Sequence, residues 1–183
     1  AGDDLSLKAL NHWVDQGYQY AIEKLANYYE DYKHDLLQAE QYHQILVQQF
    51  LCQPSIEWYY QQSLSGPIEI FQSFRKHFAL QSRQLEIQFT YAKILFARGE
   101  IDESIGIMSK YVGEVSVRKW LEKHESPCPQ IKFQLAKLHA IGLCYPKNID
   151  LALNKYKALV EDDYLPALDA LIQLALENKF AEG

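Results

Sequence analysis

Residues 130–178 read QIKFQLAKLHAIGLCYPKNIDLALNKYKALVEDDYLPALDALIQLALEN. Apolar and small residues recur in this stretch at the spacing of a helix face, in three groups: Phe133, Leu135, Ala136, Leu138, His139 and Ile141; Leu151, Ala152, Tyr156 and Leu159; Ala167, Leu168, Leu171, Leu174 and Ala175. Gly142 is placed to end the first helix in a left-handed conformation, and Pro146 blocks its continuation. Asn148 or Asp150 can cap the second helix. The stretch therefore predicts helices in succession, joined by short turns.

The same pattern occurs elsewhere in the chain, which indicates internal repeats. The best repeat units cover residues 18–50, 84–113 and 130–178. In the first unit, Ala21 and Leu25 repeat the spacing of Ala167 and Leu171. Residues 54–84 fit the pattern less well, but they also have helical periodicity and contain no clear strand. We predict an all-α protein of about eleven helices that forms a single helical-repeat domain over residues 1–183.

Seven positions of the third unit match the pattern of a known repeat family: Ile131, Leu135, His139, Gly142, Ala152, Tyr156 and Ala167. On these residues the unit resembles a Sel-like repeat, a relative of the tetratricopeptide repeat, and the step of 36 residues from Leu135 to Leu171 is the Sel-like length. The middle unit is more similar to a plain tetratricopeptide repeat through Tyr91, Ala92, Leu95, Gly99, Ile101, Ser104 and Met108. His139 departs from the usual aromatic residue. The resemblance implies a right-handed α-solenoid of helix-turn-helix repeats.

The two ends of the chain fall at particular places in this repeat. The chain begins inside a helix of the second type, in which Ser6, Leu10 and Val14 fill the family positions. The last predicted helix is of the first type and ends at Asn178. A complete solenoid normally has polar capping repeats. We therefore expect the chain to be part of a longer array.

The charge and the cysteines exclude several classes of protein. The formal net charge is −6 and the basic residues are scattered, apart from Arg75, Lys76 and His77. Nucleic-acid binders normally present a basic face, so we expect no nucleic-acid partner. No apolar run approaches the ~18 residues of a membrane span. Cys52, Cys128 and Cys144 are irregularly spaced and do not suggest a disulfide framework.

The sequence lacks the common motifs of catalytic and cofactor sites. It contains no HExxH zinc motif, no GxSxG nucleophile motif, and neither GxGxxG nor a GxxxxGK phosphate loop. The acidic clusters lie where helices are expected to begin, and the helix dipole accounts for acids at such positions. We expect a non-catalytic protein without a metal or cofactor.

The resemblance also implies a binding surface. In the tetratricopeptide pattern, certain positions of the first helix of each repeat point into a concave groove. The corresponding residues are Glu23, Asn27, Glu86, Phe89, Lys93, Phe133, Lys137, Asp169 and Gln173. Their mixture of apolar, acidic and basic side chains suits a protein or peptide, although ordinary solvated helix faces would have a similar composition.

Three consecutive aromatic residues, Trp58, Tyr59 and Tyr60, are a second candidate site. Consecutive residues on a helix cannot share one face, so at least one of the rings should be exposed. An exposed ring could anchor a protein partner or stack on a carbohydrate. The alternative is that the rings pack between neighbouring helices.

These observations favour a protein-protein interaction scaffold or adaptor, which the resemblance places in a bacterial multiprotein assembly. The partner would be another protein or peptide. Some Sel-like arrays serve the secretion of exopolysaccharides such as alginate, so a periplasmic assembly factor is one alternative, and a carbohydrate- or ligand-binding module is another. The resemblance slightly favours the periplasm over the cytoplasm, while the cysteine pattern is compatible with both compartments.

Overall fold

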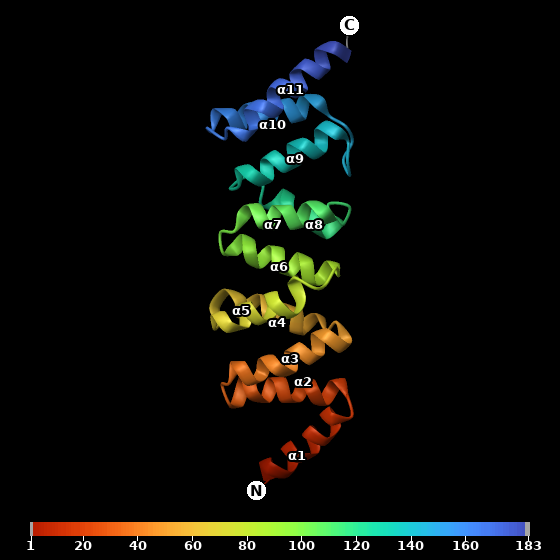
Figure 1. Cartoon of the computed structure of the whole chain (residues 1–183), viewed down its shortest axis with the longest axis vertical. Coiled ribbons are helices and arrows are strands. Elements are labelled where there is room, and N and C mark those ends of the chain that lie inside the picture. The colour runs from red at the N-terminus through yellow and green to blue at the C-terminus, as the bar shows by residue number, and fades with distance from the viewer. Residues whose placement is uncertain (1, 182–183) are drawn as a thin grey trace. The chain divides into compact units, whose positions relative to one another are not determined.

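The computed structural model describes the backbone of residues 2–181 and the side chains of residues 6–177 (Figure 1). Over that range the chain forms eleven α-helices and no strand, which confirms the predicted all-α class and the number of helices. The helices are α1 (Gly2–Asp15), α2 (Gln19–Asn27), α3 (Leu36–Phe50), α4 (Gln53–Ser65), α5 (Ile68–Phe74), α6 (Leu85–Ala97), α7 (Ile101–Met108), α8 (Val115–Lys123), α9 (Pro129–Ile141), α10 (Ile149–Glu161) and α11 (Pro166–Ala181). No helix in the described range is both long and apolar enough to cross a membrane.

The chain forms two compact units, Ala1–Arg98 and Gly99–Gly183. Their boundary lies in the turn between α6 and α7, inside the repeat unit predicted at residues 84–113. Each unit has buried residues of its own, as an independent folding unit requires. The extent of the repeat domain over residues 1–183 stays a prediction.

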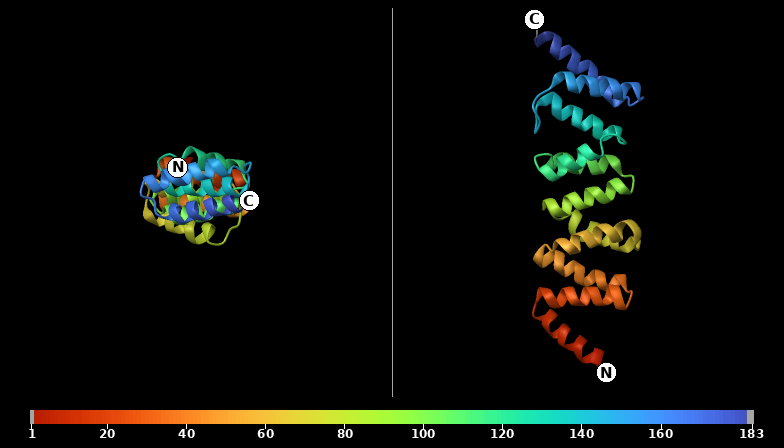
Figure 2. Two further views of the ribbon diagram at one scale, coloured as in Figure 1. Left: turned by 90° about the horizontal axis from the view of Figure 1, so that it is seen from above. Right: turned by 180° about the vertical axis from the view of Figure 1, so that it is seen from behind.

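In the first unit, helices that are consecutive in the sequence pack on one another (Figure 2). α1 packs on α2, α2 on α3 and α3 on α4, while α4 contacts both α5 and α6. Ile22 and Ala26 of α2 and Leu46 of α3 are buried together in this arrangement. Burying a side chain the size of Ile or Leu contributes about 1.5–3 kcal/mol, so the apolar faces of short helices account for their order.

Two helices of the first unit end in π-helical turns, η1 (Tyr28–Tyr32) after α2 and η2 (Arg75–Ala79) after α5. Together α5 and η2 cover residues 68–79, part of the stretch 54–84 in which the sequence has helical periodicity. Phe74 and Phe78 lie on either side of the junction and both are buried. Their ring centroids are 5.0 and 5.5 Å from that of Tyr59 in α4. The π turn thus belongs to an aromatic core between α4 and α5.

In the second unit, α7 and α8 pack on α9, α9 packs on α10, and α10 packs on α11. A cluster of buried residues joins the last three of these helices: Ala136, Ala152, Tyr156, Leu159 and Ala167. The distance between packed helices depends on the side chains at the contact. Because three of the five are alanines, the helices can approach closely around the ring of Tyr156.

The predicted ends of α9 and α10 are confirmed. Gly142 follows α9 with φ +74°, a conformation that side chains with a Cβ adopt at a cost. The side chain of Asn148 accepts a hydrogen bond from the backbone N–H of Leu151 at 2.9 Å. Asn148 rather than Asp150 is therefore the N-cap of α10.

Candidate functional site

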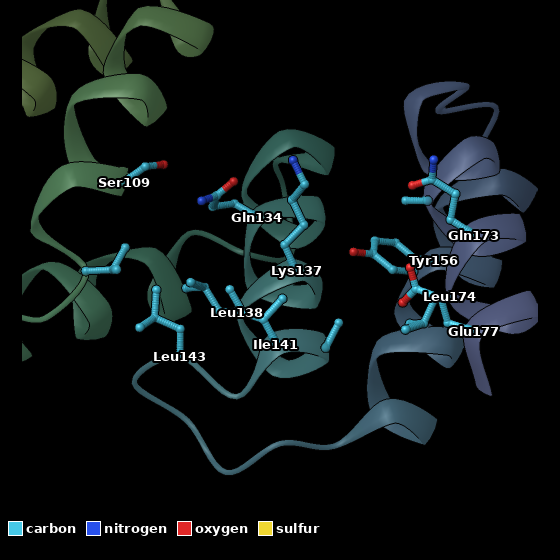
Figure 3. Close-up of a pocket in the computed structure, with 13 residues that line it drawn as sticks. Ser109, Gln134, Lys137, Leu138, Ile141, Leu143, Tyr156, Gln173, Leu174 and Glu177 are labelled. Atoms are coloured by element: carbon cyan, nitrogen blue, oxygen red, sulfur yellow. The ribbon is translucent and has the colours of Figure 1, made fainter. Parts of the chain in front are cut away.

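The second unit contains a groove with a volume of about 430 Å³ (Figure 3). Its lining comes from α9 and α11, from the turn after α7, from the loop after α9, and from Tyr156 of α10. The apolar part of the lining consists of Val112, Leu138, Ala140, Ile141, Leu143, Ala170 and Leu174. Its polar part consists of Ser109, Gln134, Lys137, Gln173 and Glu177. An apolar floor with polar groups at its rim is typical of a binding site.

Part of the apolar lining is open to solvent, although Val112 and Leu138 are buried. Ile141, at the end of α9, is 65% exposed, and Leu143, after Gly142, is also exposed. Large apolar side chains that lie exposed next to one another often mark an interaction site. Transfer of these side chains from water to a partner would be favourable at about 25 cal/mol per Å² of apolar surface.

The rim supplies charges and hydrogen-bonding groups. The Lys137 ammonium lies over the ring of Phe133, 4.9 Å from its centroid, and Figure 3 shows Lys137 on α9 across the hollow from Gln173 and Glu177 on α11. Burial raises the pKa of Tyr156, so its phenol stays protonated at neutral pH and can donate a hydrogen bond. The groove thus offers a cation, a carboxylate, amides and a hydroxyl around an apolar centre.

No family model matches the chain, and comparisons with curated proteins and with solved structures give no match either. The resemblance to Sel-like repeats therefore stays a prediction. Within the described range, no three His, Cys, Asp or Glu side chains are grouped so that they could hold a metal ion.

The structure brings together two of the groove residues predicted in the second unit. Lys137 and Gln173 both line the groove. Phe133 instead packs against the rings of Tyr156 and Tyr164, with centroid distances of 5.6 and 5.7 Å. Asp169 is exposed on α11 but does not line the groove.

The groove residues predicted in the first unit form separate clusters. On α2, Glu23 and Asn27 line a small cavity of about 160 Å³ between α2, α3 and the start of α4. On α6, Glu86 is exposed, whereas Phe89 and Lys93 are half-buried. The cavity beside α2 takes in Glu23 and Asn27 and none of the three predicted residues of α6.

The Lys93 ammonium has two aromatic neighbours. It lies 4.7 Å from the ring centroid of Tyr60 in α4 and 5.4 Å from that of Phe89 in its own helix. A cation over an aromatic face is attracted by about 0.5–1 kcal/mol at an exposed site. This local arrangement fixes Lys93 against α4.

The aromatic run in the middle of α4 differs from the prediction. Trp58 and Tyr59 are buried, and Tyr60 is half-buried. Trp58 stacks on His43 of α3 at 4.1 Å, and Tyr59 packs between Phe74 and Phe78. The prediction of Trp58 and Tyr59 as exposed anchors is wrong, because α4 is covered by α3 on one side and by α5 on the other. The three rings therefore do not form an exposed row on which a carbohydrate could stack.

The small cavity beside α2 contains a polar cluster around His43. Its Nδ1 lies 3.0 Å from Oγ of Ser55, and its Nε2 lies 3.9 Å from a carboxylate oxygen of Glu30. Burial lowers the pKa of His43 to about 4, so the imidazole is neutral at physiological pH. Ser55 is buried as well, which keeps its hydroxyl away from a substrate in solution. These contacts describe a packed polar core.

Some exposed apolar and aromatic side chains were not among the predicted site residues. Trp13, Tyr18 and Tyr20 form an aromatic patch where α1 turns into α2, together with Leu10 and Ala21. The ring centroids of Trp13 and Tyr18 are 5.0 Å apart. The signal in the sequence is the presence of three aromatic residues around a helix-ending glycine. Likewise, Ile141 and Leu143 flank Gly142, where exposed apolar residues are unusual.

Proposed function

We propose that this chain is a non-catalytic scaffold that binds another protein through the groove of the second unit. The observation that supports this function is the apolar lining of the groove, in which Ile141 and Leu143 are exposed. Such a surface is costly in water unless a partner covers it. The polar rim can fix the orientation of that partner.

The composition of the groove suits a segment of polypeptide. Its volume lies within the range of about 300–1,000 Å³ for ligand sites. The amides of Gln134 and Gln173 can bind the peptide groups of an extended or helical segment, while the floor accepts its apolar side chains. Lys137 and Glu177 can select charges on either side of that segment.

The architecture that we propose for the whole chain is a right-handed α-solenoid of Sel-like and tetratricopeptide-like repeats. The packing of α9 on α10 and of α10 on α11 supports it, since each helix contacts its neighbours in the sequence. The step of 36 residues from Leu135 to Leu171 supports it as well. In such repeat proteins the extended surface serves for binding. The resemblance suggests a bacterial multiprotein assembly as the setting.

The proposal is tested by site-specific photo-crosslinking in extracts of the source cell. A photoreactive phenylalanine analogue replaces Gln173, whose exposed side chain lines the groove. The matched control carries the same analogue at Lys157, which is exposed on α10 and does not line the groove. We expect one protein to be crosslinked from position 173 and not from position 157.

A second arm uses variants of the groove. Ile141→Asp combined with Lys137→Glu should abolish the crosslink, because a charge is placed in the apolar floor and the charge of the rim is reversed. Val115→Asp, which puts a charge at an exposed apolar site of α8 outside the groove lining, should leave the crosslink intact. Equal crosslinking from both positions, or a crosslink that survives the groove variant, contradicts the proposal.

A further inference from the structure

A second groove, with a volume of about 360 Å³, lies in the first unit between α3, η2 and the start of α6. We refer to it as the η2 groove. Val47, Phe78 and Ile87 contribute buried apolar side chains to its lining. The exposed side chains of the lining are all polar: Gln48, Gln81, Arg83 and Gln84. The η2 groove therefore offers a ligand mainly hydrogen bonds and a positive charge.

The turn between η2 and α6 forms one side of the η2 groove and is fixed by hydrogen bonds. The side-chain amide of Gln88 in α6 donates to the backbone carbonyls of Ala79 and Ser82, at 2.7 and 2.8 Å. The side-chain amide of Gln81 donates to the backbone carbonyl of Lys76 at 3.1 Å. The backbone that carries the lining is therefore ordered before a ligand binds, which lowers the entropic cost of binding.

The stretch of chain that forms this side is basic. Arg75, Lys76 and Arg83 are close together in the sequence and all three are exposed, while residues 70–85 contain no Asp or Glu. Arg83 lines the η2 groove, and Arg75 and Lys76 directly precede the lining residue His77. The whole chain, by contrast, has a formal net charge of −6. The η2 groove thus lies in a basic part of an acidic protein.

The acids of the surrounding helices lie outside the lining. Glu40 of α3 is buried and accepts hydrogen bonds inside the core. Glu86 of α6 is exposed but does not line the η2 groove. Glu57 and Glu69 are exposed on α4 and α5, two helices that contribute no residue to the lining. Since salt screens exposed charges over about 10 Å at 0.1 M, the cations in and beside the lining dominate the field that a ligand in the η2 groove meets.

We propose that the η2 groove binds an acidic segment of another polypeptide. A carboxylate of that segment pairs with the guanidinium of Arg83, which can donate two parallel hydrogen bonds to it. The side-chain amides of Gln48 and Gln84 bind peptide groups of the segment, and Arg75 and Lys76 attract further acids beside the groove. The η2 groove shares no residue with the groove of the second unit, so this interaction is independent of the partner proposed above.

The observations favour a polypeptide over a nucleic acid. Phosphate contacts supply much of the affinity for a nucleic acid, and a binding surface therefore needs many basic side chains. Here one arginine lines the η2 groove and two further cations lie beside it in the sequence. The other exposed lining residues are glutamines, whose amides match the donors and acceptors of a peptide backbone.

The experiment measures the binding of a labelled peptide built from Glu, Ser and Leu by fluorescence anisotropy. The control peptide has Gln in place of Glu. We expect saturable binding of the acidic peptide that weakens as the salt concentration rises. The control peptide should bind about ten-fold more weakly or less, because it lacks the charges that pair with the basic side chains.

Two variants with the same change of charge locate the site. Arg83→Glu should weaken binding of the acidic peptide by about ten-fold or more, because it places a like charge against the ligand. Lys33→Glu alters an exposed residue of the first unit that does not line the η2 groove, and it should leave the affinity within about two-fold. Lys76→Glu, at an exposed position next to the lining, should weaken binding to a smaller extent than Arg83→Glu.

Several outcomes overturn the proposal. They are an acidic peptide that does not bind the wild type, equal affinities of Arg83→Glu and Lys33→Glu, and a single-stranded oligonucleotide that binds more tightly than the peptide. Circular dichroism checks the helical content of each variant. If Arg83→Glu does not fold, Lys76→Glu decides, and wild-type affinity in that variant overturns the proposal. The variant with Ile141→Asp and Lys137→Glu should bind the peptide as the wild type does, which separates this result from a failure of the proposed function.

Discussion

The hydroxyl of Tyr59 in α4 donates a hydrogen bond to Oε1 of Glu40 in α3, 2.5 Å away, inside the core of the first unit. The hydroxyl of Ser73 in α5 donates to the same oxygen at 2.6 Å. Glu40 and Tyr59 are both buried, and a buried carboxylate is stable only when hydrogen bonds replace its water. Burial beside Glu40 raises the pKa of Tyr59 above its usual range, so the phenol remains a donor. One carboxylate thus joins α3 to both α4 and α5.

Tyr59→Phe should therefore destabilise the first unit while its aromatic packing stays intact. A hydrogen bond to a charged group contributes about 1.5–3 kcal/mol, and we expect a loss of that size in the free energy of unfolding. Denaturant titration measures it. Tyr20→Phe is the matched control, since the ring of Tyr20 is exposed, and its effect should stay within about 0.5 kcal/mol. Equal stabilities of the two variants would show that the Glu40 contact contributes nothing.

The lowered pKa of His43 should make the stability of the first unit depend on pH. Its pKa is lowered by burial from 6.5 to about 4. Between these values the unfolded chain binds a proton that the folded chain does not, so the free energy of unfolding falls as the pH falls. The contribution of His43 is complete above pH 6.5, and about 3 kcal/mol is lost by pH 4, at 1.36 kcal/mol for each pH unit.

The measurement is the slope of unfolding free energy against pH over that interval, in the wild type and in His43→Gln. The variant should be less stable at pH 7, because it loses the stacking on Trp58, but its slope should be smaller. His12→Gln, which replaces an exposed histidine, controls for the change in composition. An unchanged slope in His43→Gln would show that His43 does not cause the pH dependence of stability.

Two glycines of the second unit should respond oppositely to alanine. Gly142 has φ +74°, and a Cβ there would lie 3.0 Å from Cβ of Lys147. Gly142→Ala should cost about 1–2 kcal/mol, the penalty of a left-handed residue with a Cβ. Gly106 lies inside α7, and a Cβ there meets no atom within 4 Å. Gly106→Ala should stabilise by about 0.5–1 kcal/mol. Thermal unfolding of the two variants gives both signs, and a Gly142→Ala protein as stable as the wild type would contradict the role of Gly142.

The helices could be predicted from the sequence because their signals are local. The apolar spacing of α9 and α10, the glycine at 142 and the cap at Asn148 all act within a few residues of the helix that they define. The burial of side chains in α4 could not be predicted from such local signals. Trp58 is buried by His43, fifteen residues earlier, and Tyr59 is buried by Phe74. Both contacts depend on which helices pack together, which helical periodicity does not contain.

The groove shows the same division. Lys137 and Gln173 follow from repeat positions on α9 and α11, and both line it. Val112 and Tyr156 could not be assigned in this way, because the turn after α7 and the buried face of α10 meet those helices only in three dimensions. Glu23 and Asn27 of α2, predicted by the same rule, line a separate cavity that contains none of the predicted residues of α6. A repeat pattern thus locates helix faces, while the packing of neighbouring helices decides which faces form a site.

Ala136 and Ile172 lie 36 residues apart, the predicted repeat step, but only Ala136 is fully buried. Substitutions at the two positions should therefore differ in their effect on stability. Ala136 is completely buried under α10, so Ala136→Ile inserts three carbon atoms into a filled contact and should cost about 1–3 kcal/mol. Ile172 is half-exposed, so Ile172→Ala should change the free energy of unfolding by no more than about 0.5 kcal/mol. Both are measured by denaturant titration. Equal losses of stability in the two variants would contradict the difference in burial between the two positions.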